Sequence, residues 1–300
     1  MEEYSKSLYP FKSKWIQLKR FNIHYIDEGC GPLILFSHAA IGSSFMYREM
    51  IKILMRDFRC VAIDYPGFGL TPSSKIYKAN IKEQCIIISE IIAALNLKNI
   101  YGFGHDTGGP SLMGSFILDH QLFRGLILTD TLVYPSSEFR KVNVMLSIVG
   151  SNLFKLFNRK FNILSKLTFN KGVLTRTLHE AELNEYDLIY NDKSKRDQMI
   201  NVLKSLKEQG DLMLKIRALF DMGLYGKPLL LIYGSDDPVR ILGVPERIMK
   251  SNDQADFFTI EGESHFPHEG QPWEMASIIT SWVKSTERII ESKEFKVDQA

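Results

Sequence analysis

The chain has 300 residues, of which 45% are hydrophobic and 24% charged, with a formal net charge of +2. This much apolar sequence supports a large buried core and excludes intrinsic disorder. The charges are scattered and nearly balanced, so they form no basic stripe for nucleic acid. We expect a small molecule as the partner and no nucleic acid.

The cysteines and the N-terminal residues indicate the cellular compartment of the protein. Its three cysteines, Cys30, Cys60 and Cys85, are widely spaced and odd in number, which favours free thiols over a disulfide framework or a metal site. The first residues lack a basic patch followed by an apolar run, and no apolar run is long enough to cross a bilayer. We therefore predict a cytoplasmic protein with no membrane partner.

Eight short apolar runs, each ending near Gly, Asp or Ser, predict β-strands. They lie at 15–20, 22–27, 32–37, 59–64, 99–104, 124–130, 227–234 and 254–260. The first two predict an antiparallel hairpin at one edge of the sheet. Helical patterns separate several of the others; from Ile81 to Leu95, apolar residues recur every three or four positions. This alternation predicts an α/β fold with a mostly parallel eight-stranded sheet and flanking helices.

The stretch from about 135 to 225 interrupts the alternation. It contains no convincing strand, but it has amphipathic helical segments at 143–161 and 199–220. A long helical stretch between two predicted strands indicates an insertion into the α/β core.

We therefore divide the chain into an α/β core, 1–134 and 221–300, and a helical cap, or lid, at 135–220. Several large apolar side chains of the cap are expected to pack and, collectively, to make an apolar pocket. Among them are Met145, Phe154, Phe157 and Phe161. The last ten residues, 291–300, are expected to fray.

A turn without bulky side chains follows the fifth predicted strand. Its sequence, from Gly104 to Gly109, is GHDTGG and matches G-x-D-x-G, a nucleophile elbow with Asp106 in place of Ser. Glycines suit an elbow because its backbone is strained and packs close to its neighbours. A helix N-cap would also favour Asp at this position, but a cap does not require Gly on both sides. We therefore predict that Asp106 is a nucleophile.

A carboxylate is ionised at neutral pH and needs no base for its own attack. The ester that it forms must then be cut by water, which requires a histidine base and an acid that orients the histidine. His265 follows the last predicted strand and Asp237 follows the one before it, in the order nucleophile, acid, histidine. Asp236 and Asp130 are alternative acids, since both also lie just beyond a strand. The other histidines near these turns are expected to be structural: His38, His105 and His268.

The chain resembles α/β-hydrolases of the haloalkane dehalogenase and epoxide hydrolase group, with the dehalogenase branch closest. The resemblance extends from about 9 to 283 and rests on stretches such as YPFKSKWIQL, IHYIDEGCGPLILFSH, FRCVAIDYPGFGLTPS, GHDTGGP, GSDDPV and SHFPHEG. It implies an α/β-hydrolase fold with a helical cap. It also implies a catalytic triad of Asp106, Asp237 and His265.

Two positions depart from the dehalogenase pattern, and both concern the leaving halide. Such dehalogenases usually have His-Gly-Asn-Pro where this chain has HAAI, so Ala40 replaces the halide-binding Asn. They usually have Trp directly after the nucleophilic Asp, where this chain has Thr107. Losing one preorganised donor costs about 2.7–4 kcal/mol of transition-state stabilisation. The backbone N–H groups of Ala40 and Thr107 need no particular side chain and are expected to form the oxyanion hole.

The sequence leaves three functions open. The first is a cofactor-free hydrolase that forms an ester between Asp106 and a small hydrophobic haloalkane, which His265-activated water then hydrolyses. The second opens or decarboxylates a strained ring, an epoxide or a β-lactone, which carries its own leaving group. The third is a ligand-binding protein on a hydrolase scaffold, which the three intact triad positions argue against. In epoxide hydrolases a cap tyrosine protonates the alkoxide, and the candidates here are Tyr134, Tyr186, Tyr190 and Tyr225.

Overall fold

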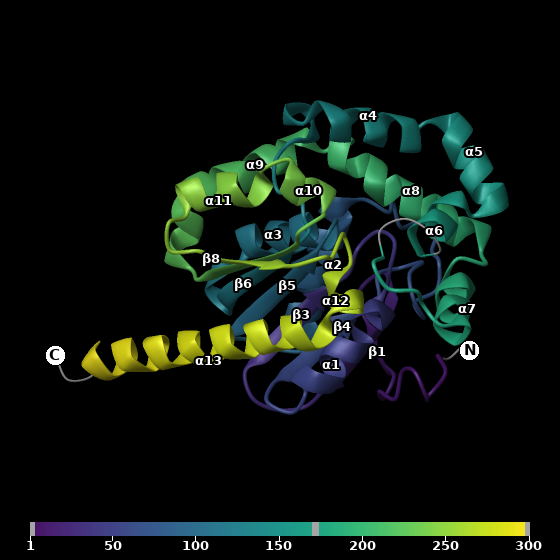
Figure 1. Cartoon of the computed structure of the whole chain (residues 1–300). Helices are drawn as coiled ribbons and strands as arrows, with labels where there is room; N and C mark the ends of the chain where they lie inside the picture. The colour runs from purple at the N-terminus through teal and green to yellow at the C-terminus, as the bar shows by residue number, and fades with distance from the viewer. Residues whose placement is uncertain (1–3, 170–173, 298–300) are drawn as a thin grey trace.

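The computed structural model describes residues 4–169 and 174–297, with side chains through 292, and contains one eight-stranded sheet covered by helices (Figure 1). The strands are β1 (Lys14–Gln17), β2 (Asn22–Glu28), β3 (Leu33–Ser37), β4 (Arg59–Ile63), β5 (Ile100–His105), β6 (Phe123–Thr129), β7 (Leu229–Gly234) and β8 (Asp256–Ile260). Their order is β1-β2-β4-β3-β5-β6-β7-β8. Strand β2 is antiparallel to β1 and β4, and all other neighbours are parallel. The predicted sheet and its edge hairpin are confirmed.

Helices cover both faces of the sheet. They are α1 (Arg48–Leu54), α2 (Ile81–Ala94), α3 (Gly108–Leu118), α4 (Arg140–Val149), α5 (Asn152–Phe161), α6 (Ile163–Leu167), α7 (Glu180–Ile189), α8 (Lys193–Glu208), α9 (Gly210–Asp221), α10 (Pro238–Ile241), α11 (Val244–Ser251), α12 (Pro267–Gly270) and α13 (Pro272–Val297). Short 3-10 helices lie at η1 (Ser44–Tyr47), η2 (His120–Leu122), η3 (Ser136–Glu138) and η5 (Gly223–Gly226). Helix α1 contacts α13 on one side of the sheet, and α3 contacts α2 and α9 on the other (Figure 1).

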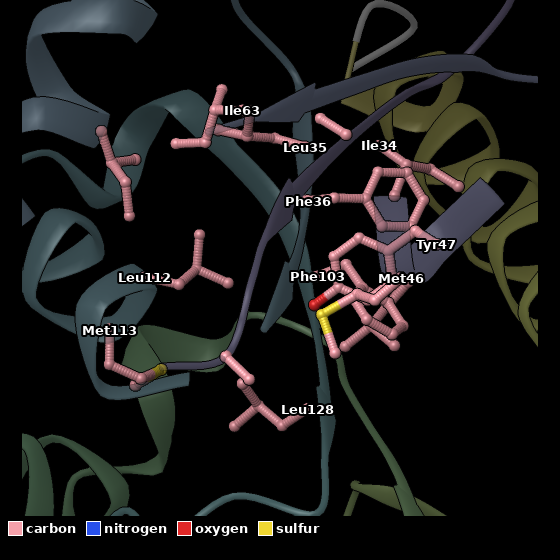
Figure 2. Packing of buried hydrophobic residues seen from close by; sticks show 14 of the residues in the cluster. Ile34, Leu35, Phe36, Met46, Tyr47, Ile63, Phe103, Leu112, Met113 and Leu128 are labelled. Atoms are coloured by element: carbon pink, nitrogen blue, oxygen red, sulfur yellow. The ribbon is translucent and has the colours of Figure 1, made fainter. Parts of the chain in front are cut away.

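The core is densest around the central strands β3 and β5, whose residues are all buried. The rings of Phe36, Tyr47 and Phe103 pack together, with centroids 5.1–5.3 Å apart. Figure 2 shows these rings on one side of β3 and Leu112 and Met113 on the other. Because both faces of these strands are covered, their sequences are continuously apolar rather than alternating. The carboxyl ends of the strands are therefore held rigidly.

Helices α4 and α5 lie outside α8, at the edge of the molecule (Figure 1). The predicted segment 143–161 is split in two, because a new N-cap begins at Ser151, whose Oγ accepts the Phe154 N–H at 3.2 Å. The expectation that the cap's apolar residues pack is wrong for Met145, Phe157 and Phe161, which are exposed. Helical periodicity locates an apolar face but does not say which way the face points.

Buried ion pairs connect α7 to the α/β core, next to the loop that contains His265. Arg48 on α1 contacts Glu269 on α12 at 2.5 Å and also contacts Glu182 on α7. Arg176 Nη2 lies 2.6 Å from a Glu269 oxygen and 2.8 Å from a Glu182 oxygen. The Tyr186 hydroxyl donates to the same Glu269 carboxylate. Each buried charge has partners of opposite sign, which offsets the cost of taking it out of water.

Helix α13 continues to Val297, so the expectation that the tail frays is wrong for 291–297. This part of the tail contains no Gly or Pro that would end a helix. Residues 298–300 lie outside the described ranges.

Two other expectations concern thiols and membranes. Cys30, Cys60 and Cys85 are free thiols as predicted, and Cys60 and Cys85 are buried. Among the helices of the described ranges, none is both long and apolar enough to cross a bilayer.

Candidate active site

Asp106 lies at a sharp turn between β5 and α3. Its backbone φ is 50°, in the left-handed region that few residues other than glycine adopt. A Cβ at Gly104 would lie 2.7 Å from the Gly109 Cα, and a Cβ at Gly108 would lie 2.2 Å from the Ser37 carbonyl oxygen. Only glycine permits these approaches, which explains the G-x-D-x-G pattern.

Hydrogen bonds from the neighbouring strand hold this turn. The Asp106 N–H donates to the Thr129 carbonyl oxygen at 3.3 Å, and the Asp106 carbonyl oxygen accepts the Thr131 hydroxyl at 2.6 Å. The same oxygen accepts the Gly109 N–H at 3.1 Å. Thr131 is a supporting residue that no motif indicated; its signal is the LTDT turn, which leaves β6 beside the elbow.

The structure brings Asp106, His265 and Asp237 together at the carboxyl ends of the parallel strands. His265 Nδ1 lies 2.6 Å from an Asp237 oxygen, and His265 Nε2 lies 3.7 Å from an Asp106 oxygen. The side chains of Asp106 and His265 are 20% and 19% exposed, so both are accessible from solvent. The Asp237 side chain is fully buried.

Asp237 is oriented by the helix that it caps. One of its carboxylate oxygens accepts the N–H groups of Val239 and Arg240 at 2.8 Å and 2.9 Å, at the start of α10. The other oxygen is the one bonded to His265. The hydrogen bonds at the N-terminus of α10 therefore hold the Asp237 carboxylate in the orientation that contacts the imidazole.

Neither alternative acid occupies this position. Asp236 is exposed on the turn after β7. Asp130 is buried, and its carboxylate accepts the Gly234 N–H at 2.9 Å and the Thr129 hydroxyl at 2.6 Å. Burial and the nearby charge of Asp237 raise the pKa of Asp130 well above its usual range, which favours the neutral form of Asp130.

The charges of the three groups depend on one another. Burial alone would lower the pKa of His265, but the Asp237 and Asp106 carboxylates outweigh it and raise this pKa well above its usual value. Burial acts to raise the pKa of Asp106, but His265 and the Thr107 N–H outweigh it and lower this pKa. The raised pKa of His265 and the lowered pKa of Asp106 both favour an ion pair between the imidazolium and the Asp106 carboxylate.

Of the three histidines expected to be structural, His38 and His105 bond to loop backbone, whereas neither ring nitrogen of His268 has a hydrogen-bond partner in the described ranges. His105 Nε2 donates to the His265 carbonyl oxygen at 2.7 Å, and burial lowers the pKa of His105 well below its usual value. His38 Nδ1 donates to the Ala39 carbonyl oxygen at 2.7 Å. Burial lowers the pKa of His268 to about 3, so this ring is also neutral. A neutral His105 supports the backbone of His265 without adding charge to the site.

The two positions that depart from the dehalogenase pattern are both fully buried. Ala40 has no side-chain donor, and within the described residues the Thr107 hydroxyl has no hydrogen-bond partner. The structure therefore supplies no side-chain amide or indole N–H at either position.

The candidate tyrosines differ in what their hydroxyls contact. Tyr186 donates to Glu269, and Tyr190 donates to a backbone carbonyl oxygen at 3.4 Å. Tyr225 is exposed and precedes β7, at the opposite end of the strands from Asp106. The buried Tyr134 hydroxyl has no hydrogen-bond partner in the described part of the chain. Tyr134 alone among the four combines burial with a free hydroxyl.

Two other features of the described residues lie apart from this site or add nothing to it. In 4–169 and 174–297, His, Cys, Asp and Glu side chains form no group of three or more that could hold a metal ion. A cavity of about 660 Å³ lies at the amino ends of β6, β7 and β8, with Phe123, Leu229 and Asp256 in its lining. That end of the sheet is opposite the carboxyl ends where Asp106 and His265 meet.

Residues 32–272 match the family described as the alpha/beta hydrolase fold. The chain belongs to the α/β-hydrolase fold family. Haloalkane dehalogenase 2 of Mycobacterium tuberculosis is 28% identical to this α/β hydrolase over 273 residues, which cover 91% of this chain and 95% of the relative. The structure of the haloalkane dehalogenase DbeA from Bradyrhizobium elkani has a TM-score of 0.82 at 17% identity, covering 93% of this chain and 99% of that one.

Two further relatives are named for reactions other than dehalogenation. Epoxide hydrolase 1 of Caenorhabditis elegans is 24% identical over 286 residues, covering 87% of this chain and 67% of the relative. Cis-3-alkyl-4-alkyloxetan-2-one decarboxylase of Shewanella oneidensis is 25% identical over 183 residues, 58% of each protein. The predicted fold and family are confirmed: this α/β hydrolase is an enzyme similar to haloalkane dehalogenases and epoxide hydrolases.

The charge coupling in the site can be measured without a substrate. Asp237→Asn removes the nearer anion from His265, so we expect the pKa of His265 to fall by about one unit or more. An NMR pH titration of the imidazole measures this shift. Asp130→Asn is the matched control and should change the His265 pKa less, because Asp130 does not bond to the ring. A larger fall with Asp130→Asn would make Asp130 the acid.

Proposed function

We propose that this α/β hydrolase forms a covalent ester between Asp106 and a carbon of a small hydrophobic substrate, which His265-activated water then hydrolyses. One observation carries the proposal: His265 contacts Asp237 through Nδ1 at 2.6 Å and faces Asp106 through Nε2 at 3.7 Å. The ring therefore has an orienting acid on one nitrogen and the nucleophile on the other.

In the first step an Asp106 carboxylate oxygen attacks the electrophilic carbon. A carbon–oxygen bond forms, and the bond to the leaving group breaks with its electron pair going to the leaving group. The lowered pKa of Asp106 keeps it ionised, so no proton has to move first. The product of this step is a neutral ester.

In the second step the ester itself changes the state of His265. Esterification removes the negative charge of Asp106, one of the two anions that raise the pKa of His265. With only Asp237 opposite it, His265 holds its proton less tightly and gives it to the leaving oxygen or to solvent, which leaves Nε2 unprotonated and able to accept a proton. It accepts a proton from water on Nε2 while the water oxygen attacks the ester carbonyl carbon. The bond between the Asp106 carbonyl carbon and the ester oxygen then breaks, and His265 gives its proton to that oxygen, so the product leaves as an alcohol. Asp106 keeps one oxygen from water and returns its acid proton to His265.

The oxyanion of the second step needs donors near the ester carbonyl. We assign this role to the backbone N–H groups of Thr107 and Ala40. The Thr107 N–H contributes to the lowered pKa of Asp106, which indicates that it faces the carboxylate.

We assign the segment 135–220 as the cap. It comprises helices α4 to α8 and most of α9, and α9 contacts α3 of the core. Phe169 contacts Phe266, the residue after His265, with ring centroids 5.9 Å apart. These two apolar rings next to His265 favour a hydrophobic substrate.

Two candidate substrates differ in their leaving group. A haloalkane is supported by the similarity to haloalkane dehalogenases. A strained ring, an epoxide or a β-lactone, is the second candidate, and Ala40 and Thr107 favour it. A ring keeps its leaving oxygen attached to the substrate and does not need a separate halide site.

Blocking the second step should trap the ester. His265→Gln keeps a hydrogen-bonding side chain but cannot act as the base, so the Asp106 ester should accumulate. We expect intact-mass and peptide mass spectrometry to find an adduct on Asp106 after incubation with a bromoalkane, an epoxide or a β-lactone. The compound that reacts identifies the leaving group. Tight binding of a panel member without any adduct would support a binding protein instead.

Restoring a halide donor tests the first candidate separately. Ala40→Asn introduces a side-chain N–H that Ala40→Leu, of similar size, does not. If the missing donor limits dehalogenation, Ala40→Asn should raise kcat for a bromoalkane by roughly 10²–10³-fold over Ala40→Leu. Halide release measures the rate, with epoxide opening as the internal control. Equal rates in the two variants would argue against a haloalkane.

A further inference from the structure

The cap carries an apolar surface that faces outward. Seven large apolar side chains of α4 and α5 are 47–67% exposed. They are Val144, Met145, Ile148, Leu153, Leu156, Phe157 and Phe161. On each helix they recur at the spacings of a single helical face. Soluble proteins expose single apolar residues routinely, but a contiguous apolar face indicates an interaction surface.

The inward sides of the same helices are partly polar. Asn158 on α5 is buried, and its side-chain oxygen accepts the Leu164 N–H at 2.8 Å. Lys155 turns toward α8 and donates to Asn201 at 2.9 Å. A surface helix normally places its polar side outward. Helix α5 instead turns Asn158 and Lys155 inward while its large apolar side chains are exposed beside Arg159 and Lys160, so its apolar face is not simply a core face left uncovered.

The charge of this segment is one-sided. The stretch 139–179 contains eight of the chain's 37 Lys and Arg and none of its 35 Asp and Glu. Acidic residues at its borders are already paired within the chain. Asp197 on α8 contacts Arg159 at 2.5 Å, and Glu138 contacts Arg247 at 2.6 Å. Arg159 and Arg176 have acidic partners, but the described ranges contain no ion pair for Arg140, Lys141, Lys160 or Lys166, so the segment keeps an excess of positive charge.

The exposed apolar face and the excess of positive charge together favour an anionic membrane as the partner. An apolar helix face bordered by Lys and Arg is the arrangement of helices that lie in the interface of anionic membranes. A second copy of the chain fits less well, because two such faces would bring the same positive charges together, and lysine is depleted from protein interfaces.

We propose that the outer face of α4 and α5 docks on the surface of an anionic lipid bilayer. The apolar side chains insert at the boundary between headgroups and acyl chains, and Lys141 and Lys160 contact the lipid phosphates and carboxylates. This places the cap, rather than the sheet, against the membrane (Figure 1). The proposal replaces the sequence-based expectation of no membrane partner, and it does not depend on the chemistry of Asp106.

The test is co-sedimentation of the full chain with vesicles. We expect binding to vesicles of phosphatidylcholine with about 30% phosphatidylserine, little binding to phosphatidylcholine alone, and weaker binding as salt is raised. The variant L156S/K160E removes one exposed apolar side chain from α5 and reverses one of its positive charges. It should weaken binding by about tenfold or more.

The matched control is L214S/K215E, which makes the same two changes on the exposed side of α9, outside this surface. It should bind like the unchanged chain. Thermal unfolding of both variants checks that neither substitution disturbs the fold, as expected for exposed positions. Equal binding by the two variants, or no binding to anionic vesicles, would overturn the proposal. So would a dimer in solution that L156S/K160E dissociates, because the face would then be an interface between two copies.

Discussion

The left-handed backbone at Asp106 is the constraint on which the site depends. An ordinary strand-to-helix connection would leave the carboxylate inside the sheet edge, whereas the turn at Asp106 exposes it above the strands. Two close approaches that only glycine permits, at Gly104 and Gly108, surround this turn, and the Thr131 hydroxyl donates to its carbonyl oxygen. The strained conformation is thus maintained by strand β6 and helix α3 rather than by the loop itself.

Electrostatics connects this geometry to the proposed chemistry. Asp106 and Asp237 flank His265, and both carboxylates raise its pKa. Forming an ester at Asp106 removes one of these charges. The covalent intermediate thereby prepares its own base, and Asp237 retains the imidazole orientation throughout. Asp130 sits near enough to Asp237 for the two carboxyl groups to interact, and this favours a neutral Asp130.

Local patterns predicted most of the sheet and the elbow. Apolar runs ending in turn residues identified all eight strands. The runs are continuously apolar in β3, β5 and β7, because both faces of these parallel strands are buried. Long-range contacts were not predictable in this way. The ties of Arg48 to Glu269, and of Thr131 to the elbow, join residues far apart in the chain. The outward apolar face of α5 was missed because periodicity does not distinguish a face that packs from one that is exposed.

The central claim is that Asp106, and not water, attacks the substrate. It is tested most directly by a single turnover of the unaltered enzyme in H₂¹⁸O, followed by mass spectrometry of the peptide that contains Asp106. The covalent mechanism predicts that ¹⁸O enters the Asp106 carboxylate, while the first alcohol released carries unlabelled oxygen from the enzyme. Appearance of ¹⁸O in the first alcohol, with none in Asp106, would show direct attack by water and contradict the account.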